Sequence, residues 1–269
     1  MFAQHRPALT IEGVTCIFPA REASPYTAIA DVSLSVAEGE FVSLIGPTGC
    51  GKSTLLNVAA GLLAPSSGTV SVFSKELSGL NSHAGYLFQS DALLPWRTAQ
   101  ENVTLGLELR GLPDRQSRRR AQEWLARVGL ATHGHKYPHE LSGGMRKRVA
   151  LAQTLILDPK MLLMDEPFAA LDVQTRSLME NELLALWSQD RKSVLFVTHD
   201  LEEAISLSDR VVVLSAGPAS RPIGEFSIDL PRPRDVSEIR LTPRFLKLQE
   251  KIWHALKDEV LKTYSREEG

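Results

Sequence analysis

Apolar residues alternate with serines along residues 32–36, so that valine or leucine occupies every second position. This period of two is typical of a strand with one buried face, and the Glu-Gly-Glu sequence at 38–40 predicts the turn after it. Residues 41–45 predict a second strand, and residues 52–62 have the apolar spacing of a helix. A glycine-rich loop therefore lies between a strand and a helix.

Further strands are predicted where short apolar runs recur along the chain. The segments are residues 69–73, 84–88, 161–164, 194–198 and 211–214. Several are continuous apolar runs, which suit strands buried on both faces of a parallel sheet. Between about residues 98 and 157 the pattern becomes helical, with helices predicted at 101–110, 115–128 and 143–157. We expect a helical subdomain inserted into an α/β core.

The chain after Ser215 differs from the preceding part in its residue composition. It contains five prolines and then an amphipathic pattern at about residues 245–261 that predicts a last helix. We expect this tail to be an appendage to the α/β core and not a separate folded domain. The basic cluster at 115–120 is interpreted as a solvated helix face.

Composition and charge narrow the function classes. The 269 residues are 43% hydrophobic and 23% charged, as in a soluble globular protein with a large core. A net charge of -2 argues against a broad basic surface, so we expect no nucleic-acid partner. With Cys16 and Cys50 the only cysteines, a reducing, cytosolic setting is expected.

The amino-terminal residues do not form the apolar run of a secretory signal. No apolar stretch approaches the roughly 18 residues that cross a bilayer. We therefore expect any membrane role to depend on a partner.

The glycine-rich loop matches the pattern G-x-x-x-x-G-K-S at residues 46–53. Glycines let backbone N–H groups approach phosphate oxygens, and the helix that follows directs its positive end at the same oxygens. We expect Lys52 to reach the β- and γ-phosphates of ATP and the Ser53 hydroxyl to ligate Mg²⁺. The alternative, a glycine-rich turn with a chance lysine, is disfavoured by the strand and helix on either side. The expected nucleotide-binding residues are Gly46, Pro47, Thr48, Gly49, Cys50, Gly51, Lys52, Ser53 and Thr54.

A second motif is the apolar strand that ends in Asp165 and Glu166. Burial of carboxylates is costly unless a cation compensates it, and Mg²⁺ is the expected cation. We expect Asp165 to hold the metal and Glu166 to accept a proton from the attacking water or to orient it. Taken alone, the motif could also be a strand that exits into solvent, but its pairing with the phosphate loop disfavours that alternative.

A third motif distinguishes this chain among nucleotide-binding proteins. In Leu-Ser-Gly-Gly-Met at residues 141–145, a serine precedes two glycines at the start of a helix. The Ser142 hydroxyl, the amides of Gly143 and Gly144 and the helix dipole together predict a second anion site. By itself the motif could be an ordinary helix cap. Its spacing supports the anion site, because Ser142 follows Lys52 by 90 residues and precedes Asp165 by 23.

With these three motifs the chain resembles the ATP-binding subunits of ABC transporters, whose signature sequence is L-S-G-G-Q. The resemblance covers about residues 9–230, which it marks as an ABC ATPase domain with a helical subdomain at about 91–158. Residues 231–269 would then be a C-terminal helical extension. The fold that the resemblance implies is α/β, a P-loop NTPase (RecA-like) core with an antiparallel β subdomain and an inserted α-helical subdomain.

The resemblance assigns roles to further residues. Gln89 matches the Q-loop glutamine, which can ligate Mg²⁺, and His199 matches the switch histidine, which can hydrogen-bond the γ-phosphate. Asp172 matches the D-loop aspartate. Phe18, a few residues after the first strand, matches the aromatic residue that stacks on adenine, although Tyr26 competes for that role. The catalytic residues are then expected to be Glu166, His199 and Lys52.

Two positions depart from the family pattern. Met145 stands in place of the usual glutamine, and Ala169 stands where many members have serine before the D-loop. Met145 cannot form an amide hydrogen bond with the nucleotide. Neither position belongs to the expected metal-binding or catalytic set, so we still expect hydrolysis.

The resemblance also implies partners and a location. It predicts a head-to-tail dimer, either a homodimer or a pair of ATPase subunits, in which the signature of one subunit caps ATP on the phosphate loop of the other. Separate transmembrane permease subunits would dock at residues 90–97, and a substrate-binding protein would belong to the system. The chain would lie at the cytoplasmic face of the inner membrane as a peripheral subunit.

A finer resemblance concerns the solute. Leu-Leu-Pro-Trp-Arg-Thr at 93–98 and Asp-Leu-Pro-Arg-Pro-Arg at 229–234 are similar to importers of the nitrate, sulfonate and taurine group. Trp96 could equally be a structural wedge. The competing function is a soluble ABC-type ATPase acting on DNA or ribosomes, although such chains usually carry tandem domains or a long coiled-coil insertion. A phosphate-loop kinase would not need the site at residues 141–145.

Overall fold

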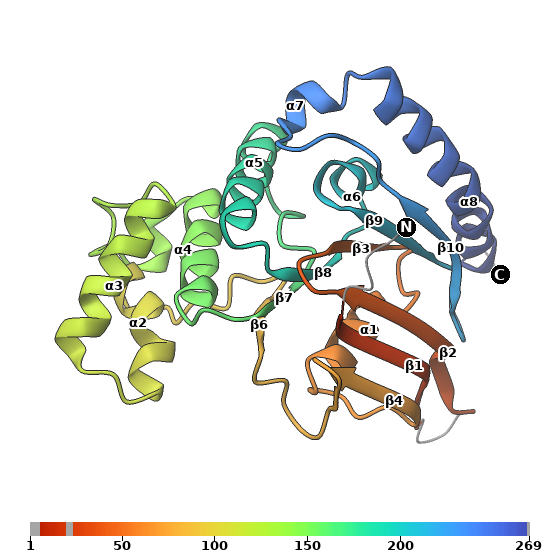
Figure 1. The fold of residues 1–269 in the computed structure, drawn as a ribbon, viewed down its shortest axis with the longest axis horizontal. Coiled ribbons are helices and arrows are strands. Elements are labelled where there is room, and N and C mark those ends of the chain that lie inside the picture. Colours follow the sequence, from red (N-terminus) through yellow and green to blue (C-terminus); the bar gives the residue numbers. More distant parts are fainter. Residues whose placement is uncertain (1–5, 20–23, 268–269) are drawn as a thin grey trace.

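The computed structural model describes residues 6–19 and 24–267, which form two β-sheets with helices around them (Figure 1). The four-stranded antiparallel sheet has the order β2-β1-β4-β5. Its strands are β1 (Pro7–Phe18), β2 (Tyr26–Ala37), β4 (Ser67–Val72) and β5 (Lys75–Glu76).

The six-stranded sheet has the order β10-β9-β3-β8-β7-β6. Its first five strands along the chain pair in parallel, and β10 closes one edge antiparallel to β9. The strands are β3 (Phe41–Ile45), β6 (Ala84–Leu87), β7 (Met161–Asp165), β8 (Ser193–Val197), β9 (Arg210–Leu214) and β10 (Pro222–Ser227). Every residue of β3 and β8 is buried, as expected for central strands covered on both faces.

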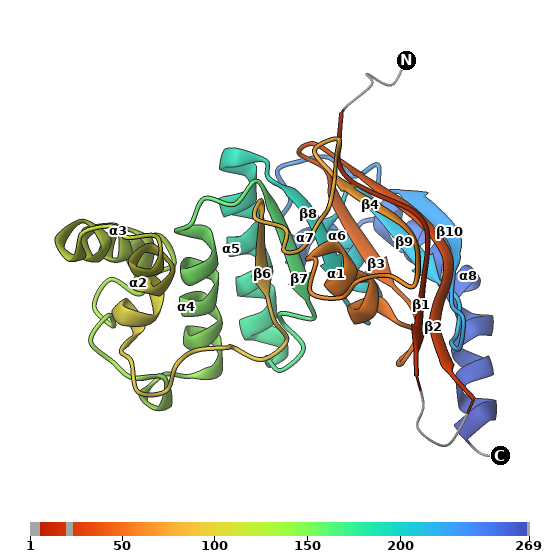
Figure 2. The same ribbon diagram turned by 90° about the horizontal axis from the view of Figure 1, so that it is seen from below.

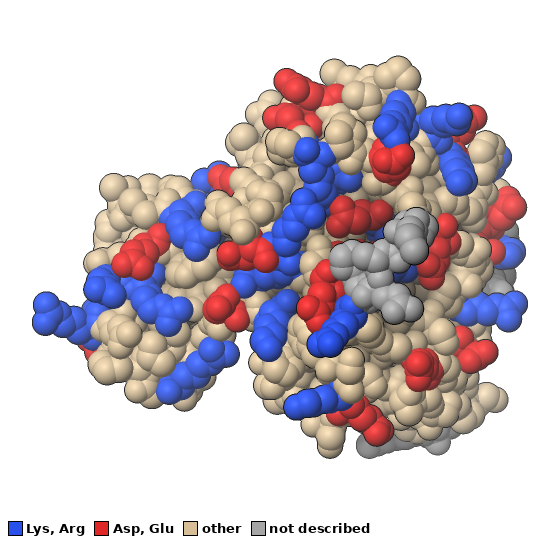
Figure 3. Space-filling view, viewed as in Figure 1, with Lys and Arg blue, Asp and Glu red and all other residues tan. Residues whose placement is uncertain are grey.

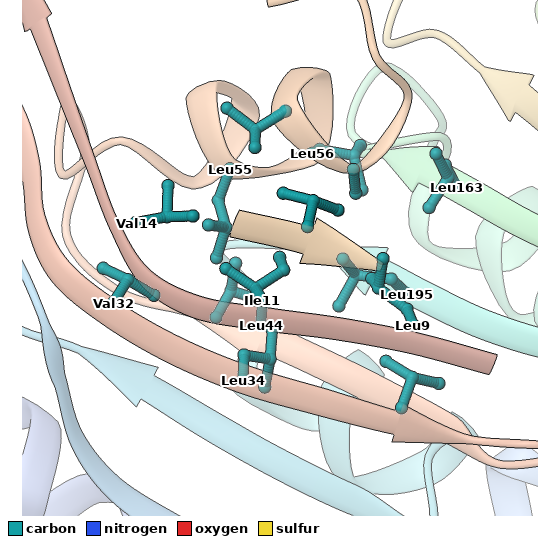
Figure 4. Packing of buried hydrophobic residues seen from close by; sticks show 14 of the residues in the cluster. Leu9, Ile11, Val14, Val32, Leu34, Leu44, Leu55, Leu56, Leu163 and Leu195 are labelled. Atoms are coloured by element: carbon teal, nitrogen blue, oxygen red, sulfur yellow. The ribbon is translucent and has the colours of Figure 1, made fainter. Parts of the chain in front are cut away.

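Helix α1 (Lys52–Ala59) lies between the two sheets and joins their cores. Leu55 and Leu56 of α1 pack in one buried cluster with Ile11 of β1 and with Leu44 and Leu195 of the parallel sheet (Figure 4). Because α1 follows the glycine-rich loop directly, this packing holds the loop at the carboxyl end of β3.

Three helices form the inserted subdomain, which extends away from the antiparallel sheet beyond β6 (Figure 2). They are α2 (Ala99–Leu109), α3 (Asp114–Arg127) and α4 (Gly143–Leu155), with the 3-10 helix η1 (Pro138–Glu140) before α4. A capping box starts α2, because Thr98 and Glu101 each accept a hydrogen bond from the other's backbone N–H. The expected α/β core, antiparallel β subdomain and helical insertion are all present.

The remaining helices cover the other side of the parallel sheet. They are α5 (Val173–Asp190), α6 (Leu201–Leu207), α7 (Val236–Ile239) and the long α8 (Pro243–Glu267). Phe245, Ile252 and Leu256 of α8 share a buried cluster with Ile205 of α6 and Val213 of β9. Over residues 6–19 and 24–267, none of the helices has both the length and the apolar character that a bilayer crossing requires.

Candidate functional site

The phosphate-loop sequence forms a tight loop between β3 and α1. Its turn is closed by a hydrogen bond from the backbone N–H of Cys50 to the Pro47 carbonyl at 3.3 Å. Gly49 and Gly51 have φ angles of 74° and 91°, in the left-handed region that favours glycine. The Lys52 side chain is buried, and its Nζ donates to the carbonyls of Gly46 at 2.9 Å and Pro47 at 3.0 Å. The ammonium group therefore lies inside the loop.

We expect Gly51→Ala to destabilise the protein and weaken ATP binding more than Gly49→Ala does. Both substitutions carry a left-handed backbone penalty of about 1–2 kcal/mol. At Gly51 the added Cβ would also lie 2.6 Å from Ile29 Cγ2. At Gly49 it meets no atom of the described residues within 4 Å, which makes this variant the matched control. Thermal unfolding and calorimetry would measure the difference, and equal effects would contradict the steric argument.

Oxygen ligands for a divalent cation meet where α1 begins and β7 ends. Ser53 Oγ donates a hydrogen bond to Asp165 Oδ1 at 3.0 Å. Burial raises the pKa of Asp165, while the hydrogen bond from Ser53 opposes the shift, and the charge of Glu166 adds to it. A carboxylate held in this way favours a compensating cation, and Mg²⁺ prefers oxygen ligands.

Across the described residues, no group of three or more His, Cys, Asp or Glu side chains could hold a metal ion. This donor set fits Mg²⁺, which binds commonly through one or two carboxylates, water and the substrate's phosphates and not in an all-protein cage. Ser53 and Asp165 are therefore suited to hold the metal together with bound ATP.

Glu166 and His199 form a contact across two neighbouring strands. The Nδ1 atom of His199 lies 2.9 Å from Glu166 Oε2. Each residue follows the carboxyl end of a parallel strand, β7 or β8, so the sheet brings the two side chains together. Glu166 has a φ of 43°, which is unusual for a residue with a side chain, and its N–H donates to the Val197 carbonyl at 2.9 Å. Backbone strain of this kind clusters at functional sites.

The phosphate loop and the Glu166–His199 pair line one cleft of about 520 Å³, whereas Asp165, which Ser53 contacts, is not among the described residues that line it. Residues 48–54 of the loop line it, while Gly46 and Pro47 lie buried behind. Phe18, Tyr26 and Gln89 also line the cleft, together with Glu166 and His199. The structure thus brings together residues from both sheets.

Both candidate aromatic residues for adenine stacking face this cleft. Phe18 and Tyr26 are paired in the register of β1 and β2, and they are 38% and 47% exposed. Strand β1 extends to Phe18 itself, so the expectation that Phe18 follows the strand is wrong, because its pairing with Tyr26 continues the ladder. The two aromatic residues stay alternatives for stacking.

The signature serine and the D-loop aspartate lie elsewhere. Ser142, Gly143, Gly144 and Asp172 are not among the described residues that line the cleft. Ser142 Oγ accepts from the Met145 N–H at 3.3 Å, which is the capping contact that the sequence left open. Asp172 Oδ1 accepts from the Thr175 N–H at 3.0 Å, and hydrogen bonds from the Thr175 side chain and then from its backbone lower the pKa of Asp172.

The signature and the D-loop adjoin each other within the chain. A Cβ added at Gly144 would lie 2.6 Å from Thr175 Cγ2. Met145 is partly buried against the apolar cluster of the helical subdomain, which explains why an apolar side chain is tolerated at this position. Both segments therefore lie on one surface, outside the cleft of the same chain.

Arg176, in the first turn of α5, is a further residue near the site that the sequence motifs do not include. Its guanidinium donates to Asp200 Oδ2 at 3.1 Å and to the Leu171 carbonyl at 3.2 Å. Arg176 thus links Asp200, which follows His199, to Leu171, which precedes Asp172. A lone arginine carries no local signal of such a contact, because the contact spans 24 residues.

Known proteins share this fold and these motifs. A family model described as "ABC transporter" matches residues 29–169. An uncharacterised ABC transporter ATP-binding protein of Methanocaldococcus jannaschii is 48% identical over 95% of this chain and 93% of its own length. A bicarbonate transport ATP-binding protein of Synechococcus elongatus is 43% identical over 91% of this chain and 88% of its own length.

Two further comparisons extend the likeness. A nitrate import ATP-binding protein of Synechococcus elongatus is 42% identical over 93% of this chain, which spans 38% of that longer protein. A solved dimeric ATP-binding cassette in a post-hydrolysis state, bound to ADP and Pi, superimposes with a TM-score of 0.73 at 32% identity. That likeness covers 83% of this chain and all of the solved chain. The P-loop NTPase core with its helical insertion and its motifs therefore identify this chain as a member of the ABC transporter family, within its ATP-binding proteins.

Proposed function

We propose that this chain hydrolyses ATP with Mg²⁺ and so powers a membrane importer of nitrate, sulfonate, taurine or a similar small solute. The observation that carries the proposal is the Glu166–His199 contact in the same cleft as the phosphate loop. The nitrate and bicarbonate relatives support a small solute as cargo. The ATPase domain would be residues 9–230, with residues 231–269 as its extension.

In the proposed site, the loop amides and Lys52 bind the phosphates of ATP. Mg²⁺, when bound, would neutralise charge on the β- and γ-phosphates. Ser53 and Asp165 would hold it, with Gln89 as a further ligand from the cleft wall. Lys52 would exchange its carbonyl partners in the loop for phosphate oxygens, which make stronger charge-assisted hydrogen bonds.

Glu166 is the proposed acceptor of the proton from the attacking water. In this proposal the His199 Nδ1 donates to Oε2 of Glu166, and Oε1 accepts a hydrogen bond from water. The Nε2 atom of His199 would donate to an oxygen of the γ-phosphate as negative charge develops there in the transition state. The contact thus orients both side chains for one reaction.

The site of a single chain is incomplete in this proposal. Ser142, Gly143, Gly144 and Asp172 lie outside the cleft, so a second ATPase subunit would supply them head to tail. The dimeric form of the solved relative supports this assembly. The partner would be a second copy or a paired ATPase subunit.

The segment before α2, residues 90–97, is proposed to dock on permease subunits at the cytoplasmic face of the inner membrane. Trp96 is 72% exposed there, which supports a role in docking over the alternative of a structural wedge. Asn102 holds the segment by accepting from the Leu94 N–H at 2.7 Å and donating to the Arg97 carbonyl at 3.0 Å. An exposed tryptophan on an ordered turn suits a protein interface.

The charge pattern disfavours the competing function on nucleic acid. On the face shown in Figure 3, Lys and Arg side chains are interspersed with Asp and Glu. The net charge of -2 agrees with that mixture. A phosphate backbone needs a clustered basic surface.

Co-purification from the native host tests the proposed function. We expect a tagged chain to retain an integral membrane protein with several spans, and we expect Trp96→Ala to lose it. Trp253→Ala is the matched control, because Trp253 is 45% exposed on α8. Recovery of nucleic acid without a membrane protein would contradict the proposal.

A further inference from the structure

The turn between β10 and α8 contains Arg234, a buried arginine whose side chain reaches back to helix α6. The side chain is enclosed, with the residue only 8% exposed. Its guanidinium donates to five backbone carbonyls, those of Ser208 at 2.8 Å, Ser206 at 3.0 Å, Leu230 at 3.1 Å, Ile205 at 3.3 Å and Ile228 at 3.5 Å. Three of these carbonyls belong to the carboxyl end of α6 and to the residue that follows it.

The contact supplies side-chain donors to the carboxyl end of α6. The last carbonyls of a helix lack partners within the helix and carry the negative end of its dipole. Burial and the nearby charge of Arg232 together lower the pKa of Arg234 to about 10, so the guanidinium stays charged at neutral pH. Arg232 adds one hydrogen bond to the Leu207 carbonyl at 2.7 Å. Substitution of Arg234 would leave several of these carbonyls unpaired.

A second arginine of the same turn joins α6 to α5. Arg240 directly follows α7, which lies close to α5 in Figure 1. Its guanidinium bonds both carboxylate oxygens of the fully buried Glu180 in α5, at 3.1 and 3.0 Å. It also donates to Ser206 Oγ in α6 at 3.3 Å. Arg240 therefore joins the carboxyl end of α6 to the middle of α5.

The amino-terminal ends of α5 and α6 adjoin the candidate site. Asp200 caps α6 by accepting two N–H groups of its first turn, and His199 directly precedes Asp200. Arg176 connects Asp200 to the segment before Asp172 at the start of α5. Because α6 has only seven residues, we expect a displacement of its carboxyl end to shift its amino end as well.

We propose that Arg234 is a positioning residue for His199, which it holds against Glu166 by anchoring the carboxyl end of α6. The inference rests on the proposed role of His199 in hydrolysis. The phosphate loop lies on a different connection, between β3 and α1. Loss of the anchor is therefore expected to slow the chemical step and to leave nucleotide affinity unchanged.

The test uses the full chain with two substitutions at Arg234. Arg234→Met retains much of the side-chain length and removes the donors, whereas Arg234→Lys retains the charge and loses the planar fork. We expect kcat for ATP hydrolysis to fall about tenfold or more in both, with the dissociation constant for ATP within about twofold of wild type. Arg244→Met is the matched control, because Arg244 lies in the same extension, pairs with Asp229 and has a side chain that is 55% exposed.

A spectroscopic measurement separates positioning from a general loss of stability. With ¹³C-labelled histidine, the His199 imidazole resonance is assigned by its loss in His199→Gln. We expect that resonance to shift or broaden in Arg234→Met and to stay unchanged in Arg244→Met. A purely structural role would instead lower the unfolding temperature and ATP affinity together.

Wild-type kcat in a folded Arg234 variant, or an unchanged His199 resonance, would overturn the inference. If Arg234→Met does not fold, Arg234→Lys is judged by the same two criteria. A wild-type protein without ATPase activity would overturn the proposed function instead. In that case the His199 resonance still decides whether Arg234 positions the imidazole.

Discussion

Glu166→Gln is expected to lower ATP turnover by about a thousandfold while ATP affinity stays within about twofold of wild type. The amide has nearly the same shape as the carboxylate, so the cleft and its loop keep their geometry. The amide cannot take a proton from water, and the loss of this proton transfer lowers kcat. Because ATP then persists between two subunits, we expect the variant to accumulate as an ATP-bound dimer.

Steady-state kinetics, calorimetry and size-exclusion chromatography with light scattering measure these effects. Glu250→Gln is the control, since Glu250 lies on α8 with its side chain exposed beside His254. A Glu166→Gln enzyme with unchanged turnover would remove Glu166 from the proposed reaction. Loss of ATP binding in the variant would show that Glu166 serves the fold of the cleft.

Lys52→Ala is expected to weaken ATP binding by about a hundredfold. A hydrogen bond to a charged group contributes about 1.5–3 kcal/mol, and about 1.4 kcal/mol corresponds to tenfold in affinity. The variant would lose contacts to two phosphates, and the carbonyls of Gly46 and Pro47 would lose their buried donor. Lower affinity is therefore expected together with a looser loop.

Calorimetric titration with ATP in the presence of Mg²⁺ measures the effect. The matched control is Lys251→Ala on α8, where the lysine is exposed near the ring of Phe226. Unfolding temperatures of both variants show whether the lost affinity reflects the site or the fold. Normal affinity in Lys52→Ala would contradict the assignment of residues 46–54 to the phosphates.

Local patterns predicted most of the parallel sheet and the helical insertion. Residues 41–45 match β3 at both ends, and the predicted strand at 161–164 is one residue shorter than β7. These segments are continuous apolar runs, and burial on both faces requires such runs. Strand β10 was not predicted, because it contains Pro222 and Gly224, residue types that are depleted in strands.

The sequence by itself also determined the family, because its motifs occur in a fixed order with fixed spacings. It could not determine which side chains meet. In the sheet order β3-β8-β7, three strands far apart in the chain place Lys52, His199 and Glu166 at neighbouring carboxyl ends. That order depends on crossovers and packing that leave no local periodicity.

Only the tertiary structure decided two further features. Ser142 lies outside the cleft, and Arg234 of the C-terminal extension contacts α6. In the sequence, Arg234 belongs to the segment 229–234 that resembles importers of the nitrate, sulfonate and taurine group, and its carbonyl partners carry no side-chain signature. Every residue type has the same backbone carbonyl group as an acceptor. Which carbonyls an arginine contacts is therefore determined by the fold and cannot be predicted from residue identity.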